Sequence, residues 1–202
     1  MFVVLEGGEG AGKSTLASAL GRRLTAAGRE VVLTREPGGT AAGEAVRALL
    51  HQPLTPWAET FGFLLARAQL VAEVVRPALG RGAFVVCDRF SGSTFAYQGY
   101  GRGLDLVALR AANANATGGL EPDLVIYLDL DPAAGLARKH GETEAIRTGV
   151  EGLAFHRRVH DGYRALAAEA PGAWVTVDAQ LSPDEVASLA WQALAERAGL
   201  SA

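Results

Sequence analysis

Short apolar runs alternate with longer segments of helical periodicity along the whole chain. The runs are rich in valine, leucine and phenylalanine, and each is followed by a segment whose apolar residues recur at helical spacing. Continuous apolar strands that alternate with helices are typical of a parallel sheet covered on both faces. The strands are expected at residues 2–6, 30–34, 84–88, 124–129 and 173–178.

The intervening segments predict the helices and their ends. Gly28 is expected to end the first helix and Ser182 to cap the last one. Pro77 predicts a frayed or kinked last turn in the longest helix. A glycine-rich stretch, residues 98–103, is interpreted as a loop. Helices are expected over residues 14–27, 41–51, 57–79, 105–116 and 151–169, with two more beginning at residues 132 and 183.

The sequence predicts a single α/β domain over residues 1–202. It contains no internal repeat, low-complexity tract or linker, and this length can bury a full core. The single cysteine, Cys87, excludes an internal disulfide and a metal cage built from cysteines. There is no basic n-region of a signal peptide and no apolar stretch of membrane-spanning length. A cytoplasmic location is therefore the simplest expectation.

A glycine-rich segment follows the first predicted strand. Its residues, GGEGAGKS, match the pattern G-x-x-x-x-G-K-[ST] and precede the first predicted helix. In that context the pattern predicts a P-loop, because glycines let backbone N–H groups face phosphate oxygens at a helix N-terminus. Lys13 supplies a mobile positive charge, and the Ser14 hydroxyl suits Mg²⁺. We therefore expect the chain to bind a nucleotide polyphosphate.

Charged residues follow the strands at their carboxyl ends, where open α/β sheets bind ligands. Arg35 and Arg89 lie after two such strands and are candidates to hold a second phosphate opposite the P-loop. Asp88 ends an apolar strand, as does the Walker-B carboxylate that binds Mg²⁺ or its waters. Solvated turn arginines and a helix-capping aspartate are the alternatives. With a net charge of −3, any phosphate-binding charge must be local.

Five motifs in order along the chain resemble those of bacterial thymidylate kinase. They are residues 7–15, T-R-E-P-G-G-T at 34–40, D-R-F at 88–90, A-Y-Q-G at 96–99 and P-D-L-V-I-Y-L-D at 122–129. The resemblance covers nearly the whole chain, and T-R-E-P-G-G-T is its most specific part. It implies a P-loop kinase fold, a homodimer, and transfer of the γ-phosphoryl group of ATP to dTMP with Mg²⁺, giving dTDP and ADP on the way to dTTP.

The resemblance also implies roles for residues around ATP. The P-loop would hold the triphosphate, Ser14 and Asp88 would meet the metal, and Arg138 would pack on adenine. Lys13, Arg35, Arg89 and a lid arginine would act in catalysis. The ATP-binding residues are then Gly7, Gly8, Glu9, Gly10, Ala11, Gly12, Lys13, Ser14, Thr15, Arg138, Asp178, Ala179 and Gln180.

A second set of residues is implied around dTMP. Arg35 and Arg89 would grip the acceptor phosphate, and Glu9 would contact the 3′-hydroxyl. The remaining roles concern the base and the sugar. Phe63 would stack on thymine, Arg67 would bond its O4, Ser93 and Gln98 would meet the base edge, and Tyr97 would lie under the sugar.

One segment, the short lid at about residues 139–149, departs from the family pattern. Family members with a comparable P-loop place basic residues here, often within D-R-I-E, whereas this chain has Ile-Arg-Thr-Gly at 146–149. Arg147 keeps the arginine but loses the flanking carboxylates. Arg147 as the lid catalyst and a plain solvated arginine are equal alternatives, and Lys139 is a possible substitute.

Two alternatives to a dTMP kinase remain open. One is another nucleoside monophosphate kinase, which only the acceptor base distinguishes. The other is a P-loop nucleotide switch. The chain has no Asn-Lys pair of the kind that reads guanine, and an ATPase switch would leave Arg35, Arg89, Phe63 and Tyr97 without a role.

Overall fold

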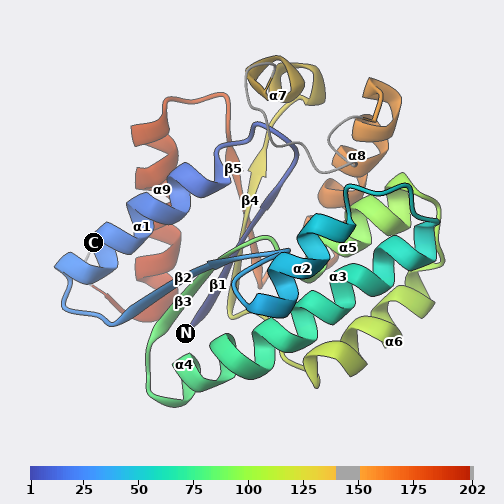
Figure 1. The fold of residues 1–202 in the computed structure, drawn as a ribbon. Helices are drawn as coiled ribbons and strands as arrows, with labels where there is room; N and C mark the ends of the chain where they lie inside the picture. Colours follow the sequence, from blue (N-terminus) through green and yellow to red (C-terminus); the bar gives the residue numbers. More distant parts are fainter. Residues whose placement is uncertain (140–150, 201–202) are drawn as a thin grey trace.

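The structure is a computed structural model that describes residues 1–139 and 151–200. Its five strands form one parallel sheet in the order β2-β3-β1-β4-β5 (Figure 1), which confirms the predicted class. The strands are β1 (Phe2–Gly7), β2 (Val31–Arg35), β3 (Phe84–Asp88), β4 (Leu124–Asp129) and β5 (Trp174–Asp178). Each lies within a residue or two of its predicted position.

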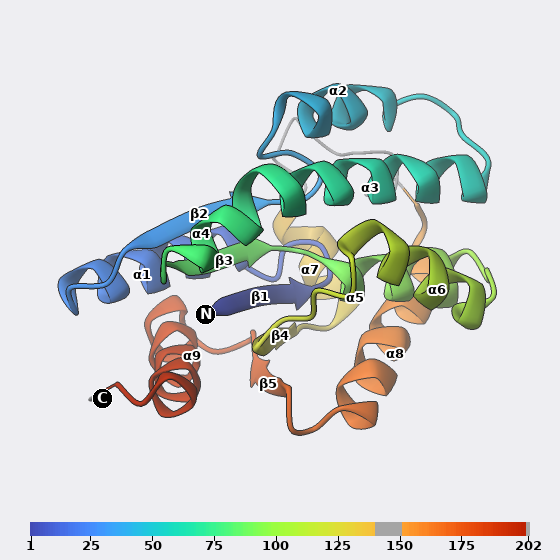
Figure 2. The same ribbon diagram turned by 90° about the horizontal axis from the view of Figure 1, so that it is seen from below.

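Helices connect the strands and cover both faces of the sheet (Figure 2). They include two π-helical segments, η1 and η2, that continue α-helices without a break. The elements are α1 (Lys13–Ala26), α2 (Ala41–Leu49), α3 (Pro56–Leu70), η1 (Val71–Val75), α4 (Arg76–Gly80), α5 (Ser91–Thr94), η2 (Phe95–Gly101), α6 (Leu106–Thr117), α7 (Pro132–Lys139), α8 (Leu153–Glu169) and α9 (Pro183–Ala198).

The two faces of β1 pack against different helices because successive side chains alternate across a strand. Val3 and Leu5 lie in one core cluster with buried residues of α1 and α9. Phe2 and Val4 lie in the other, with residues of the α3–η1–α4 helix. Glu6 follows Val4 on this second face, where its carboxylate is fully buried. The strand thus carries one acid into the interior beside the P-loop.

The long helix predicted over residues 57–79 forms as three consecutive segments, α3, η1 and α4. Pro77 lies in the first turn of α4, immediately after the π-helical residues 71–75. Proline lacks an N–H, and its ring collides with the carbonyl four residues earlier in a regular α-helix. The wider π turn accommodates it, so helical structure continues to Gly80.

The predicted loop at residues 98–103 is wrong, because helical structure continues through Gly101 as η2. The glycines serve packing. A β-carbon on Gly99 would lie 2.5 Å from the Leu106 side chain, and one on Gly101 would lie 2.7 Å from the Phe155 ring. Both distances are shorter than side chains tolerate, so glycine lets η2 approach α6 and α8 closely.

Helix α7 rests on the P-loop through two glycines. A β-carbon on Gly135 would lie 2.3 Å from the backbone oxygen of Glu9, and one on Gly10 would lie 2.2 Å from the backbone oxygen of Gly135. Gly10 also has a φ of 68°, which side chains other than glycine rarely adopt. The conformation of the P-loop and the position of α7 therefore depend on each other.

Replacing Gly135 with alanine should disturb the P-loop. The added methyl group meets backbone atoms that cannot rotate away, so the loop must shift, and we expect nucleotide affinity to fall at least about tenfold. Titration with an ATP analogue measures the effect. Gly80→Ala is the matched control, because a β-carbon at this helical glycine meets no atom within 4 Å. Unchanged affinity in Gly135→Ala would contradict the coupling.

Candidate active site

Three glycines with positive φ shape the loop between β1 and α1. Gly7, Gly10 and Gly12 have φ angles of 146°, 68° and 89°. A side chain on Gly7 would also collide with the Leu128 backbone oxygen, 2.7 Å from its β-carbon position. Gly12 is the N-cap of α1, so the loop leads directly into the helix N-terminus, where backbone N–H groups favour anions. This is the geometry that the P-loop pattern predicts.

Lys13 is buried within the loop that it follows. Its Nζ donates to the backbone oxygens of Gly7 and Gly8, at 3.1 and 2.8 Å. Burial and the nearby positive charge of Arg89 lower the pKa of Lys13 to about 8, against the opposing effect of the surrounding carboxylates. A phosphate would offer this ammonium group a stronger partner than the two backbone oxygens.

The two expected metal ligands lie together. The Ser14 hydroxyl donates to Asp88 Oδ2 at 2.6 Å, which joins the start of α1 to the end of β3. Mg²⁺ prefers oxygen ligands and is usually held in nucleotide sites by one or two protein oxygens together with phosphates and waters. A hydroxyl and a carboxylate at this position fit that requirement.

Arg89 lies beside Lys13 and is held in an unusual backbone conformation, with φ at 74°. Its Nη1 donates to the Gly7 backbone oxygen at 3.0 Å, the same atom that accepts from Lys13. Its Nη2 donates to Glu9 at 3.1 Å and to the Tyr97 hydroxyl at 3.3 Å. Two cations therefore converge on one backbone oxygen, in contact with the carboxylate expected to bind the sugar.

Glu6 fixes the turn that carries Arg89, a role that the sequence analysis missed. One carboxylate oxygen accepts from the N–H groups of Phe90 and Ser93, both at 3.0 Å. The other accepts from the Ser93 hydroxyl at 2.6 Å and the Tyr163 hydroxyl at 3.1 Å. Burial raises the pKa of Glu6, and the hydrogen bonds from Ser93 and Phe90 and the charge of Arg89 oppose that rise. The only sequence feature that points to this role of Glu6 is its place at the end of an apolar strand.

Arg35 ends β2, where it is in register with Asp88 of β3. The predicted proximity of the two arginine-bearing strand ends is therefore present. The side chain of Arg35 is half exposed and pairs with Glu44 at 3.5 Å, whereas Arg89 faces the P-loop. The two guanidinium groups thus have separate partners in this structure.

Arg67 is buried, and all five of its N–H donors have partners within the protein. Two reach Glu36 Oε2, at 2.8 and 2.6 Å, and a third reaches the Phe90 backbone oxygen. The other two reach the side-chain oxygens of Thr94 and Asn113. Through these contacts, Arg67 joins α3 to the end of β2, to α5 and to α6. Its expected contact with a base remains a prediction. Sequence reasoning missed Glu36 and Asn113.

Other residues expected at the acceptor nucleotide surround this centre. Phe63 is partly buried against the small cluster that contains Val46 and Leu50. The hydroxyl of Ser93 binds Glu6, and the Tyr97 hydroxyl donates to Glu9 at 3.1 Å. Gln98 is buried, and its amide nitrogen donates to a carboxylate of α3.

The residues expected at adenine also meet. Arg138, near the end of α7, donates to the Ala179 backbone oxygen at 3.1 Å. Asp178 accepts from the N–H of Gln180, which shapes the turn after β5. Arg147 and most of the predicted lid lie outside the described residues, and Lys139 is the last residue of α7.

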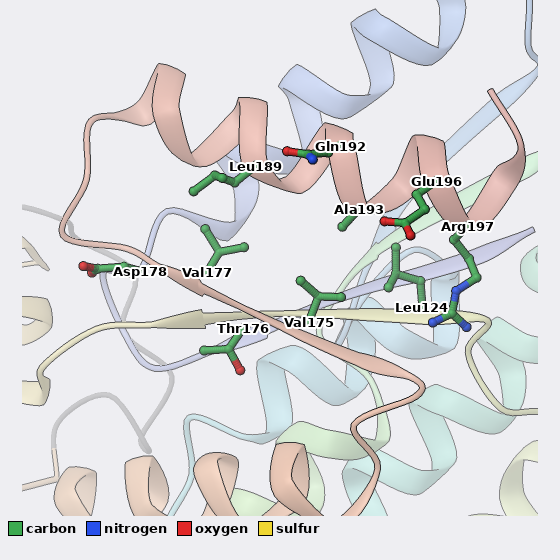
Figure 3. A pocket seen from close by; sticks show the side chains of 10 residues that line it. All are labelled: Leu124, Val175, Thr176, Val177, Asp178, Leu189, Gln192, Ala193, Glu196 and Arg197. Atoms are coloured by element: carbon green, nitrogen blue, oxygen red, sulfur yellow. The ribbon is translucent and has the colours of Figure 1, made fainter. Parts of the chain in front are cut away.

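A cavity of about 600 Å³ lies away from the P-loop, between β5 and α9 (Figure 3). Its walls include Val175 of β5 and Leu189 of α9. Of the described residues expected in the site, Asp178 alone lines it. Within residues 1–139 and 151–200, no helix has the length and apolar character needed to cross a membrane.

The chain matches known proteins along nearly its whole length. The sequence model described as thymidylate kinase matches residues 5–190. The chain is 53% identical over 193 residues to a thymidylate kinase from Gloeobacter violaceus, covering 93% of this chain and 91% of the relative. It is 49% identical over 203 residues to one from a Synechococcus strain, covering 100% and 97%, respectively.

A solved structure agrees with these matches. The crystal structure of thymidylate kinase from Ehrlichia chaffeensis is similar to this fold, with a TM-score of 0.80 and 30% sequence identity. The similarity covers 96% of this chain and 97% of that one. From sequence and structure together, the chain belongs to the thymidylate kinase family.

Proposed function

We propose that this site transfers the γ-phosphoryl group of ATP to dTMP, giving dTDP and ADP, with the donor on the P-loop and the acceptor phosphate on Arg89. Membership of the family supports both substrates. The observation that supports this placement is the hydrogen bonding of Lys13 and Arg89 to one backbone oxygen, that of Gly7. Phosphates bound to these two cations would be neighbours, as a direct transfer requires.

The chemistry requires no general base from the protein. The second pKa of a phosphate monoester is about 6, so the acceptor is mostly a dianion at neutral pH and already nucleophilic. The difficulty is that two anionic phosphates repel each other as they approach. Lys13 and Arg89 offset that repulsion and stabilise the charge of the transition state. The side chain of Arg89 would exchange the Gly7 oxygen for the acceptor phosphate.

We further propose Mg²⁺ as the metal, with Ser14 and Asp88 holding it directly or through water. When bound, Mg²⁺ would neutralise charge on the donor phosphates. Arg35 would support the acceptor phosphate after leaving Glu44, and Arg147 or Lys139 would approach from the lid. Family resemblance and the short Ser14–Asp88 contact support these assignments.

The two nucleosides would lie on opposite sides of the phosphates that the P-loop and Arg89 bind. We propose that Arg138 and residues 178–180 hold adenine, which their mutual contact supports. Glu9 would bind the 3′-hydroxyl of dTMP and Tyr97 would underlie the sugar, since both side chains already contact Arg89. For thymine we propose contacts with Phe63, Arg67, Ser93 and Gln98.

We also propose a single domain over residues 1–202, a cytoplasmic location and a homodimer. The dimer would use the outer side of α3, opposite the side that carries Phe63 and Arg67. There Phe61 and Leu65 are 59% and 54% exposed and lie four residues apart, so they form one apolar stripe. Trp57 packs against Phe61 and extends the stripe by a turn.

Arg89→Ala should abolish phosphoryl transfer while ATP still binds. Removing a phosphate-binding arginine from a phosphoryl-transfer site costs about 10³–10⁵ in rate. Product formation with ATP, Mg²⁺ and dTMP measures the loss, and titration with an ATP analogue measures binding. Arg81→Ala is the control, because Arg81 pairs with Glu30 on the surface. Near-normal turnover by Arg89→Ala would refute the assignment.

ATP binding should take up a proton at pH 8.5 to 9. The pKa of Lys13 in the free site is about 8, so much of the side chain is neutral there, and the triphosphate favours the charged form. The proton taken up comes from the buffer. Calorimetric titration in two buffers with different ionisation enthalpies measures it, and uptake should vanish at pH 6.5 and in Lys13→Gln. A binding enthalpy that does not depend on the buffer at pH 8.5 would contradict the role of Lys13.

Phe61→Glu should convert the proposed dimer into a monomer, because a charge at the centre of an apolar contact cannot be solvated there. Light scattering after size-exclusion chromatography should give twice the chain mass of 21.0 kDa for the native chain and a single mass for the variant. Leu189→Glu, at an exposed position of α9, should leave the dimer intact. A native chain that elutes as a monomer would refute this interface.

A further inference from the structure

The amide of Gln98 is held by a buried carboxylate of the neighbouring helix. Gln98 lies in η2 with only 1% of its surface exposed, and its Nε2 donates to Glu59 Oε1 at 2.8 Å. Glu59, itself 4% exposed, lies on α3 one turn before Phe63. Because residues four apart share a helix face, Glu59 continues the row formed by Phe63 and Arg67. This row includes two of the residues proposed to hold thymine.

The identity of the Glu59 side chain determines which way the Gln98 amide points. An ionised carboxylate only accepts hydrogen bonds, so the NH₂ end of the amide must face it. The carbonyl oxygen, Oε1, must then face the opposite way. Within the described part of the chain, no hydrogen bond is donated to this Oε1. The orientation of the amide thus follows from the hydrogen-bonding chemistry of the two side chains.

The Glu59 carboxylate is in turn fixed by an ion pair. Nη2 of Arg102 donates to Glu59 Oε2 at 3.1 Å. Nη1 of the same guanidinium binds Glu151 at 2.7 Å, and the group lies over the Phe155 ring at 4.9 Å. Arg102 is therefore anchored by Glu151, which precedes α8, and by Phe155 within α8. The ion pair thus holds the Glu59 carboxylate beside Gln98.

The free end of the amide is an acceptor, and pyrimidines differ in what they offer to an acceptor. Thymine and uracil carry a hydrogen on N3, whereas N3 of cytosine is itself an acceptor. An outward-facing Oε1 would bind the N3–H of thymine and would oppose the N3 lone pair of cytosine. A site with a buried polar group discriminates strongly against a ligand that leaves this group unpaired.

We infer that Glu59 is a specificity-determining residue, which selects bases that carry an N3 hydrogen by fixing the orientation of the Gln98 amide. The inference rests on the proposed function, in which Gln98 meets the edge of the acceptor base. Glu59 acts through Gln98 and is a positioning residue. It excludes dCMP and does not separate dTMP from dUMP, because both bases carry the N3 hydrogen.

The test is the ratio of kcat/KM for dTMP to kcat/KM for dCMP. In Glu59→Gln, the new amide can present either its oxygen or its nitrogen to Gln98, so the Gln98 amide is free to turn over. We expect the dTMP/dCMP ratio to fall at least about tenfold. The dTMP/dUMP ratio should stay unchanged. Such ratios do not depend on the folded fraction, so loss of stability alone cannot produce this pattern.

Two further variants separate this inference from a general packing effect. Glu59→Met removes the acceptor at similar length, so its dTMP/dCMP ratio should fall as well. Arg110→Met removes an exposed arginine that pairs with Glu169 and leaves the Glu59–Arg102 ion pair intact, so its ratio should stay close to that of the native chain. If Glu59→Gln and Glu59→Met both keep the native ratio, the inference is overturned.

Failure of the proposed function would look different. If Gln98→Ala keeps the native dTMP/dCMP ratio, Gln98 does not contact the base, and the inference falls together with that assignment. If Gln98→Ala lowers the ratio and the Glu59 variants do not, Gln98 contacts the base and Glu59 alone is wrongly assigned. A native chain that does not turn over dTMP would refute the proposed function itself.

Discussion

The backbone oxygen of Gly7 accepts hydrogen bonds from both Lys13 and Arg89, and the site is arranged around this shared acceptor. Two positive charges in a buried place repel each other. They stay together because the carboxylates of Glu9 and Asp88 lie close by and favour the charged form of Lys13. Substrate phosphates would replace a weak backbone partner with a strong anionic one. The free site is thus preorganised for negative charge.

Buried acids hold the remaining parts of this arrangement in place. Glu6 fixes the turn after β3, Glu36 binds Arg67, and Glu59 orients Gln98. Burial raises the pKa of Glu36 to about 6, and Arg67 opposes that rise. In each case a carboxylate without access to bulk water is paired with N–H or O–H donors from another element. Removing one partner leaves a costly unpaired group, so these contacts specify how the helices meet.

The sequence predicted the sheet and the P-loop because both depend on local pattern. Five apolar runs that alternate with helical segments are enough to predict five parallel strands. The pattern G-x-x-x-x-G-K-S, placed between a strand and a helix, predicts a P-loop. The glycines at 99 and 101 misled the prediction, since a glycine that relieves a helix contact looks the same in sequence as one that makes a turn. Likewise, the partners of Glu6 and Glu59 lie 39 or more residues away in the chain, so nothing local shows which groups these acids bind. Such partners become visible only when the elements pack.

The central claim is that two phosphate sites meet at Gly7. A crystal structure of the chain with adenosine and thymidine joined through five phosphates tests it most directly. The account predicts adenosine-side phosphates on residues 7–15 and a thymidine-side phosphate bound to Arg89, whose Nη1 has left the Gly7 oxygen. An Arg89 Nη1 that still donates to the Gly7 oxygen, with no phosphate contact, would contradict it.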